Sequence, residues 1–179
     1  MSIGFKSLPF DFTDCPELTA AYDVWCGWRG EKTAPSWTDV DLSGLPPKLL
    51  PFVVVVDTLD DGDFRYRFWG TGLSDLYGVN ITGMTVSEAT GEGFRQITLE
   101  QLNLVVTDQK PHLFQTVIEK SSGARVIKVN LRMPVMDHPD SVTKVISISS
   151  LERIAVPDHE GASEVWEAAM MTTGQKNLS

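Results

Sequence analysis

Residues 64–86 read FRYRFWGTGLSDLYGVNITGMTV, and this stretch decides how the rest of the chain is interpreted. Aromatic residues and arginines alternate through 64–69, which is typical of a β-strand, and Gly70 and Gly72 interrupt the extended pattern. Two short turns follow, the first ending at Gly78 and the second at Gly83. The stretch therefore predicts one strand followed by short helical turns.

The patterns on either side complete an α+β arrangement. An amphipathic helix is predicted from about Asp14 to Trp28, followed by a connector rich in turn residues. Further elements are predicted as a strand over 52–56, a helix over 92–108, and strands over 112–119, 126–133 and 142–151. We expect a five-stranded antiparallel sheet covered by helices on one face.

One folding unit with extensions accounts for the whole length. The predicted division is a helix and connector over 1–50, a core over 51–153, and a tail over 154–179 that can hold a short helix. Because the formal net charge is -9, we expect neither nucleic acid nor an anionic membrane surface as a partner. No apolar run is long enough to span a bilayer, and the two cysteines suit a reducing compartment, so a cytoplasmic protein is expected.

The element order and local motifs resemble those of PAS domains. Gly78 and Gly83 match the two glycines that close the short turns after the second strand, and RVIKVNLRMPV (125–135) resembles the fourth strand. More narrowly, Trp25, PSWTDVDL (35–42) and RFWGT (67–71) resemble a family of small stand-alone bacterial PAS-like proteins. That family usually has a basic residue at the position of Trp37 and a proline at the position of Leu42.

The resemblance implies a cavity between helices and sheet, and the sequence bears on what that cavity holds. Haem needs an axial ligand, but the helix over 92–108 has no histidine. Flavin photochemistry in this fold needs a cysteine on the helical side, where neither Cys15 nor Cys26 lies. We therefore expect no haem and no flavin. No catalytic motif and no metal-binding spacing occurs, so we expect neither a catalytic residue nor a metal site.

The candidate ligand-binding residues centre on Arg67, which precedes the Gly70 to Gly72 break. A guanidinium there could hold a small acidic ligand, or it could form an ion pair within the protein. Residue types and positions in the predicted sheet and turns give the full set of candidates as Arg67, Tyr66, Tyr77, His112, Phe114 and Asn130. Alternation along the strand does not show which side chains face the helices.

Two functional hypotheses follow. The first is a sensory module that binds a small molecule and signals to a partner protein, and the alternative is a ligand-free adaptor with a filled core. An enzyme with a cone-shaped fold that transfers protons is a distant third. The apolar stripe of Tyr22, Trp25 and Trp28 on the first helix must cover the sheet, bury against another copy, or both, and our hypothesis is that it forms a homodimer interface. An open cavity with polar groups would favour the sensor.

Overall fold

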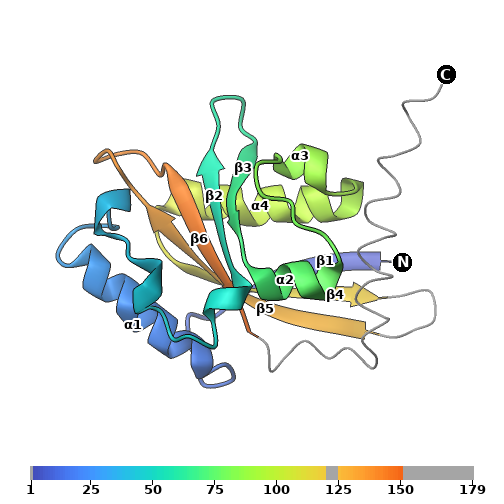
Figure 1. Ribbon diagram of the computed structural model, residues 1–179, viewed down its shortest axis with the longest axis horizontal. Coiled ribbons are helices and arrows are strands. Elements are labelled where there is room, and N and C mark those ends of the chain that lie inside the picture. Colours follow the sequence, from blue (N-terminus) through green and yellow to red (C-terminus); the bar gives the residue numbers. More distant parts are fainter. Residues whose placement is uncertain (1, 120–124, 151–179) are drawn as a thin grey trace.

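The chain folds around a single antiparallel sheet with the strand order β1-β4-β5-β6-β2-β3 (Figure 1). The computed structural model describes residues 2–119 and 125–150. The strands are β1 (Ser2–Leu8), β2 (Val53–Thr58), β3 (Phe64–Trp69), β4 (His112–Glu119), β5 (Arg125–Val135) and β6 (Lys144–Ser149). The α-helices are α1 (Glu17–Arg29), α2 (Thr71–Tyr77), α3 (Val86–Ala89) and α4 (Glu92–Asp108), and short 3-10 turns η1 (Trp37–Asp39), η2 (Leu42–Gly44) and η3 (Leu50–Phe52) form the connector.

The α+β class and the antiparallel sheet are confirmed, and so are the five predicted strands. The structure adds a sixth strand, β1, which pairs with β4 from Ser2 opposite Glu119 to Leu8 opposite Leu113. The sequence does not predict this strand, because Ile3 and Phe5 are its only strongly apolar residues before Leu8 and nothing nearby marks a hairpin. The edge next to β4 is therefore occupied by the N-terminal segment.

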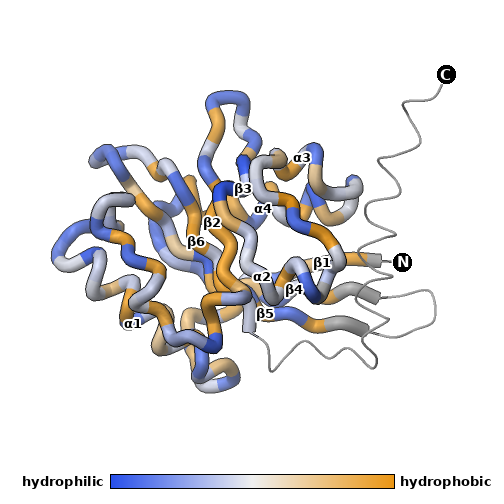
Figure 2. The backbone as a smooth tube through the Cα atoms, viewed as in Figure 1, coloured by the Kyte–Doolittle hydropathy of each residue, from blue (hydrophilic) through white to orange (hydrophobic). Residues whose placement is uncertain are grey.

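Strands β2 and β6, which pair with each other inside the sheet, form the middle of the hydrophobic core. Val53 to Val56 are all buried, and every residue of β6 is buried, which fits strands covered on both faces. Figure 2 shows these strands as strongly hydrophobic and the tip of the β2–β3 hairpin as hydrophilic. The core therefore needs cover on both sides of the sheet.

Helices supply that cover on two faces, whereas the sequence analysis expected them on one face only. Helices α2, α3 and α4 lie on one side, α1 with η1 and η2 lies on the other (Figure 1), and η3 at the end of the connector contacts α2. The indole N–H of Trp25 in α1 donates a buried hydrogen bond of 3.0 Å to the carbonyl oxygen of Pro134 in β5. We call the α4 side the inner face and the α1 side the outer face.

The two predicted glycine turns protect the β3 edge of the sheet. Gly78 and Gly83 both adopt a positive φ, 70° and 90°, which glycine tolerates best. After the second turn, the amide of Tyr66 donates to the carbonyl of Met84, and the amide of Gly83 donates to the carbonyl of Tyr66. The backbone of β3 is thus paired at Tyr66 on its outward side, which limits association through this edge.

Several predictions fall outside the described residues. They are the turn at 121–123, the tail over 154–179 and the final residue of the strand predicted over 142–151. Within the described ranges, no helix is both long and apolar enough to cross a membrane.

Candidate functional site

A pocket of about 90 Å³ lies on the inner face, between α4 and the sheet. Apolar walls come from Val54, Val56, Trp69, Phe94, Ile97 and Leu102. Polar groups come from both layers and comprise Tyr66, Tyr77, Thr90, Thr98, Gln101, Thr116, Lys128, Asn130, Arg132, Ser147 and Ser149. No Asp or Glu from the described part of the chain lines the pocket.

Strand β5 contributes the polar floor because its residues alternate between the two faces. Lys128, Asn130 and Arg132 line the pocket, while the intervening Val129, Leu131 and Met133 are buried. Register with β6 places Asn130 opposite Ser149 and Arg132 opposite Ser147. These pairs are bonded, since the Ser149 hydroxyl donates to Asn130 Oδ1 at 2.9 Å.

Arg132 is a buried cation held by neutral groups. Its Nε donates to Gln101 Oε1 at 3.1 Å, and its Nη1 donates to the Ser147 hydroxyl at 2.8 Å. Gln101 is itself fixed, because its amide nitrogen donates to the Thr116 hydroxyl at 3.0 Å. Burial lowers the pKa of Arg132 to about 10, so the guanidinium keeps its charge at neutral pH. The hydrogen bonds that Arg132 donates to Gln101 and Ser147 fix the orientation of its guanidinium group.

Lys128 supplies a second basic group, with its Nζ 5.8 Å from the centre of the Tyr77 ring. Burial, and secondarily the charge of Arg132, lowers the pKa of Lys128 to about 7. Burial also raises the pKa of both Tyr66 and Tyr77 to about 12, so both phenols remain protonated at neutral pH. The pocket thus combines basic groups and hydroxyl donors.

A β-bulge explains which side chains of β3 reach the pocket. Val55 pairs with Phe68 and Val56 pairs with Tyr66, so Arg67 is the extra residue in the β2–β3 ladder. Because of this extra residue, Tyr66 and Trp69 both line the pocket although three positions separate them. Simple alternation along the strand would place them on opposite faces.

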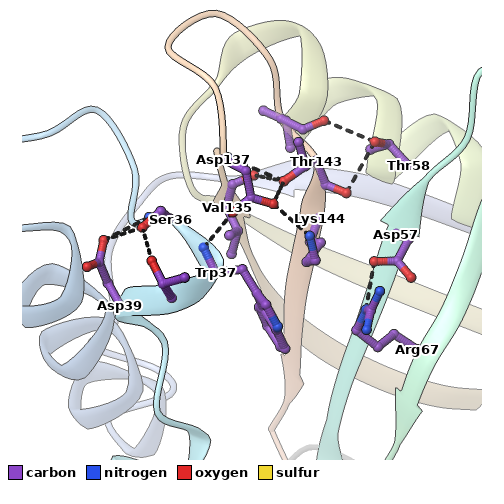
Figure 3. A network of polar contacts seen from close by, with 12 residues as sticks. Ser36, Trp37, Asp39, Asp57, Thr58, Arg67, Val135, Asp137, Thr143 and Lys144 are labelled. Carbon is purple, nitrogen blue, oxygen red and sulfur yellow. Dashed lines mark hydrogen bonds and ion pairs between the residues drawn. The ribbon is translucent and has the colours of Figure 1, made fainter.

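Arg67 lies outside the pocket. Its Nε forms an ion pair of 2.8 Å with Asp57 Oδ1, and its side chain is 47% exposed. Its guanidinium carbon lies 5.9 Å from the centre of the Trp37 ring, and Lys144 Nζ lies 5.6 Å from the same ring (Figure 3). Arg67 therefore helps to hold the connector rather than a cavity ligand.

Asp137 fastens the same connector to the sheet (Figure 3). Its carboxylate accepts from the backbone amide of Trp37 at 2.7 Å, from Thr143 Oγ1 at 2.8 Å and from Lys144 Nζ at 2.8 Å. Burial alone would raise the pKa of Asp137, but donation by Lys144, the Trp37 amide and Thr143 outweighs it and lowers the pKa to about 2. The folded state therefore favours the ionised form.

We expect this carboxylate to contribute to stability above its ordinary pKa and to lose that contribution as pH falls from about 4 through about 2. Asp137→Asn should lower the free energy of unfolding by about 1 kcal/mol at neutral pH, since the site is partly exposed. Urea unfolding at a series of pH values measures the difference, which should vanish near the acid limit. Asp140→Asn, at an exposed position in the same turn, is the control. A difference that does not change with pH would contradict the assignment.

The other predicted site residues divide into two groups. Tyr66, Tyr77 and Asn130 line the pocket. His112 and Phe114 lie beside it on β4, with their rings stacked at 5.5 Å between centroids. His112 Nε2 is 2.9 Å from the Asp108 carboxylate at the end of α4, although burial lowers the pKa of the histidine.

The aromatic stripe of α1 is largely used within the chain. Trp25 is 1% exposed and stacks on Tyr22 with 6.0 Å between ring centroids. Tyr22 also contacts Phe10 and Phe12, whereas Trp28 packs partly buried against the core. Trp25 is therefore unavailable to a second copy, and self-association through Tyr22 and Trp28 stays a prediction.

Sequence reasoning missed the basic and polar residues that most distinguish the pocket, namely Lys128, Arg132, Gln101, Ser147 and Ser149. The signal was present in RVIKVNLRMPV, where polar residues alternate with apolar ones. Such alternation is typical of a strand with one face in water. In this structure α4 covers the polar face of β5, and no pattern in the sequence of β5 indicates that a helix lies over it.

A sequence-family model described as a PAS domain matches residues 13–148. Among solved structures, the PAS domain of a protein from Colwellia psychrerythraea is 17% identical with a TM-score of 0.39, over 55% of this chain and 84% of that chain. A fungal LOV domain photoreceptor is 13% identical with a TM-score of 0.44, over 78% and 96% of the two chains. The PAS domain of the fruit-fly ELK potassium channel is 14% identical with a TM-score of 0.36, over 54% and 82%. No curated protein matches the chain.

Proposed function

Because this chain belongs to the PAS domain family, we propose that it is a sensory module that binds a small molecule between α4 and the sheet and signals through protein contacts. The observation that carries the proposal is the contrast between the two faces of β5. Its outer face presents Val129, Leu131 and Met133, as a filled core requires. Its inner face presents Lys128, Asn130 and Arg132 to a cavity.

This contrast favours the sensor over the ligand-free adaptor. Burying polar groups lowers stability unless each finds a partner, so a core that serves only packing has no use for them. The inner face keeps a cavity of about 90 Å³ beside a buried guanidinium. A binding role accounts for both features.

The size of the pocket supports a small ligand and no large prosthetic group. Pockets for drug-sized molecules measure roughly 300–1,000 Å³. A volume of about 90 Å³ would have to expand several-fold to enclose a haem or a flavin. We expect the purified protein to be colourless and without enzymatic activity of its own.

Helix α4 is the element best placed to relay occupancy of the pocket. Ile97, Thr98 and Gln101 line the cavity, while Gln96 and Glu100 on the same helix are exposed. A ligand that shifts α4 would therefore alter a surface that a partner protein can contact.

Filling the pocket should abolish ligand retention. Thr98→Phe places a ring into the cavity from α4, and Glu100→Phe adds the same ring on the exposed side of the helix. Native mass spectrometry of protein purified from its own cells should show a small molecule on the wild type and on Glu100→Phe, but not on Thr98→Phe. Equal retention by all three proteins, or retention by none, would argue against the pocket as a sensory site.

A further inference from the structure

Two basic side chains line the pocket, and neither has an acidic partner in the part of the chain that the structure describes. Neither Lys128 nor Arg132 forms an ion pair with an Asp or Glu anywhere in the described ranges. The chain as a whole has 24 acidic residues against 15 lysines and arginines. A buried positive charge without a counter-charge is unfavourable, so this arrangement among the described residues favours an anion as the ligand of the pocket.

Arg132 has the geometry of an anion-binding residue. It is 9% exposed, and its hydrogen bonds to Gln101 and Ser147 use Nε and Nη1. The remaining nitrogen, Nη2, has no hydrogen-bond partner among the described residues. Nη2 and the second N–H of Nη1 can still donate, and this pair of nitrogens is suited to bind a planar anion through two parallel hydrogen bonds.

The walls and volume of the pocket narrow the class of anion. An engineered apolar cavity of about 150 Å³ accepts benzene, so a pocket of about 90 Å³ accommodates on the order of four non-hydrogen atoms, with space for a substituent at its open side. Phe94, Ile97 and Leu102 line it from α4 and would face a short carbon skeleton. A phosphate would instead set charged oxygens against these side chains, at a desolvation cost.

Resting on the proposed function, we propose that the ligand is a small carboxylate anion, bound by Arg132 and flanked by Lys128. The two residues lie on the same face of β5, with Cα atoms about 13 Å apart by strand geometry, and their side chains extend into one pocket. The weakened basicity of Lys128, whose pKa is lowered to about 7, is what burial beside another cation produces. A bound carboxylate would offset both effects.

Thermal unfolding and calorimetric titration with acetate, lactate and pyruvate test this proposal, each compared with its neutral amide and with inorganic phosphate. We expect at least one of the three carboxylates to raise the melting temperature and to bind about tenfold or more tightly than its amide and than phosphate. Arg132→Met should weaken that binding by about tenfold or more. Its melting temperature without ligand should change little, because removal of the buried charge offsets the loss of the hydrogen bonds to Gln101 and Ser147.

Arg67→Met is the matched control, since it makes the same substitution on the same sheet outside the pocket and should leave carboxylate binding unchanged. Arg132→Lys retains the charge without the planar fork, and about a tenfold loss of affinity is expected. If Arg132→Met does not fold, Arg132→Lys becomes the test of whether Arg132 binds the carboxylate. An affinity of Arg132→Lys equal to that of the wild type would overturn the proposal.

The outcomes separate this inference from the proposed function. If the amides or phosphate bind as tightly as the carboxylates, the carboxylate inference fails and the pocket remains a binding site. The same conclusion follows if no probe binds and native mass spectrometry shows a retained molecule without a carboxylate. If no probe binds and no molecule is retained, the proposed function fails as well. A retained molecule that contains a carboxylate and is lost in Arg132→Met supports both.

Discussion

Replacing Trp25 with alanine is expected to lower the free energy of unfolding by about 3–5 kcal/mol. The indole is 1% exposed in the layer between α1 and the sheet, so its removal leaves a large cavity. The change also strands the carbonyl oxygen of Pro134, which accepts the indole N–H. Urea unfolding followed by circular dichroism measures the loss.

Trp28→Ala is the matched control, because it makes the same substitution one turn later on a side chain that is only partly buried. We expect a loss of about 1–2 kcal/mol there. Sedimentation of both variants separates core from interface. If Trp25→Ala gives a folded monomer of nearly wild-type stability, Trp25 belongs to an interface between copies instead.

A single methyl group at Gly70 is expected to destabilise the fold by about 3 kcal/mol or more. The Cβ of an alanine at this position would lie 2.2 Å from the carbonyl oxygen of Pro51 and 3.0 Å from that of Val53. Both contacts are with backbone, and the Gly70 amide donates to the Val53 carbonyl, so neither side can easily move away. With φ at -59° and ψ at 146°, the requirement is for space and not for unusual backbone angles.

Gly27→Ala provides the comparison, since Gly27 lies within α1 and has no atom within 4 Å of an added Cβ. There we expect a gain of about 0.5–1 kcal/mol from reduced backbone entropy in the unfolded chain. If thermal unfolding shows the same change in stability for Gly70→Ala and Gly27→Ala, the backbone around Gly70 can move to accommodate a methyl group at little free-energy cost.

The parts of the fold that depend on local patterns could be predicted from the sequence. Helix α4 begins at Glu92 and ends at Asp108 as predicted, because its apolar residues recur at helical spacing and Lys110-Pro111 follows it. Strands β3 and β4 likewise have their predicted bounds. In each case, turn residues and periodicity near the element carry the information.

The candidate site was less predictable because its decisive features are not local. The extra residue in β3 is defined by pairing with β2, and it is what turns Tyr66 and Trp69 to the same side and leaves Arg67 outside. Whether Lys128 and Arg132 on β5 face water or a cavity depends on α4, and strand β4 separates α4 from β5 in the sequence. From the sequence, either an acidic ligand or an internal ion pair was expected at Arg67; Arg67 forms an ion pair with Asp57, and the arginine that lines the pocket is Arg132.

The pairing of β1 with β4 also bears on the order in which the chain folds. During synthesis, Leu8 is made long before its partner Leu113, so β1 has no strand to pair with until β4 has been synthesised. Closing so long a loop carries a large entropic barrier, and proteins dominated by such distant pairings fold slowly. Strand β1 should therefore join late, after β4 and β5 have formed their hairpin. Until then the outer edge of β4 is unpaired, and an unpaired strand edge can associate with another chain.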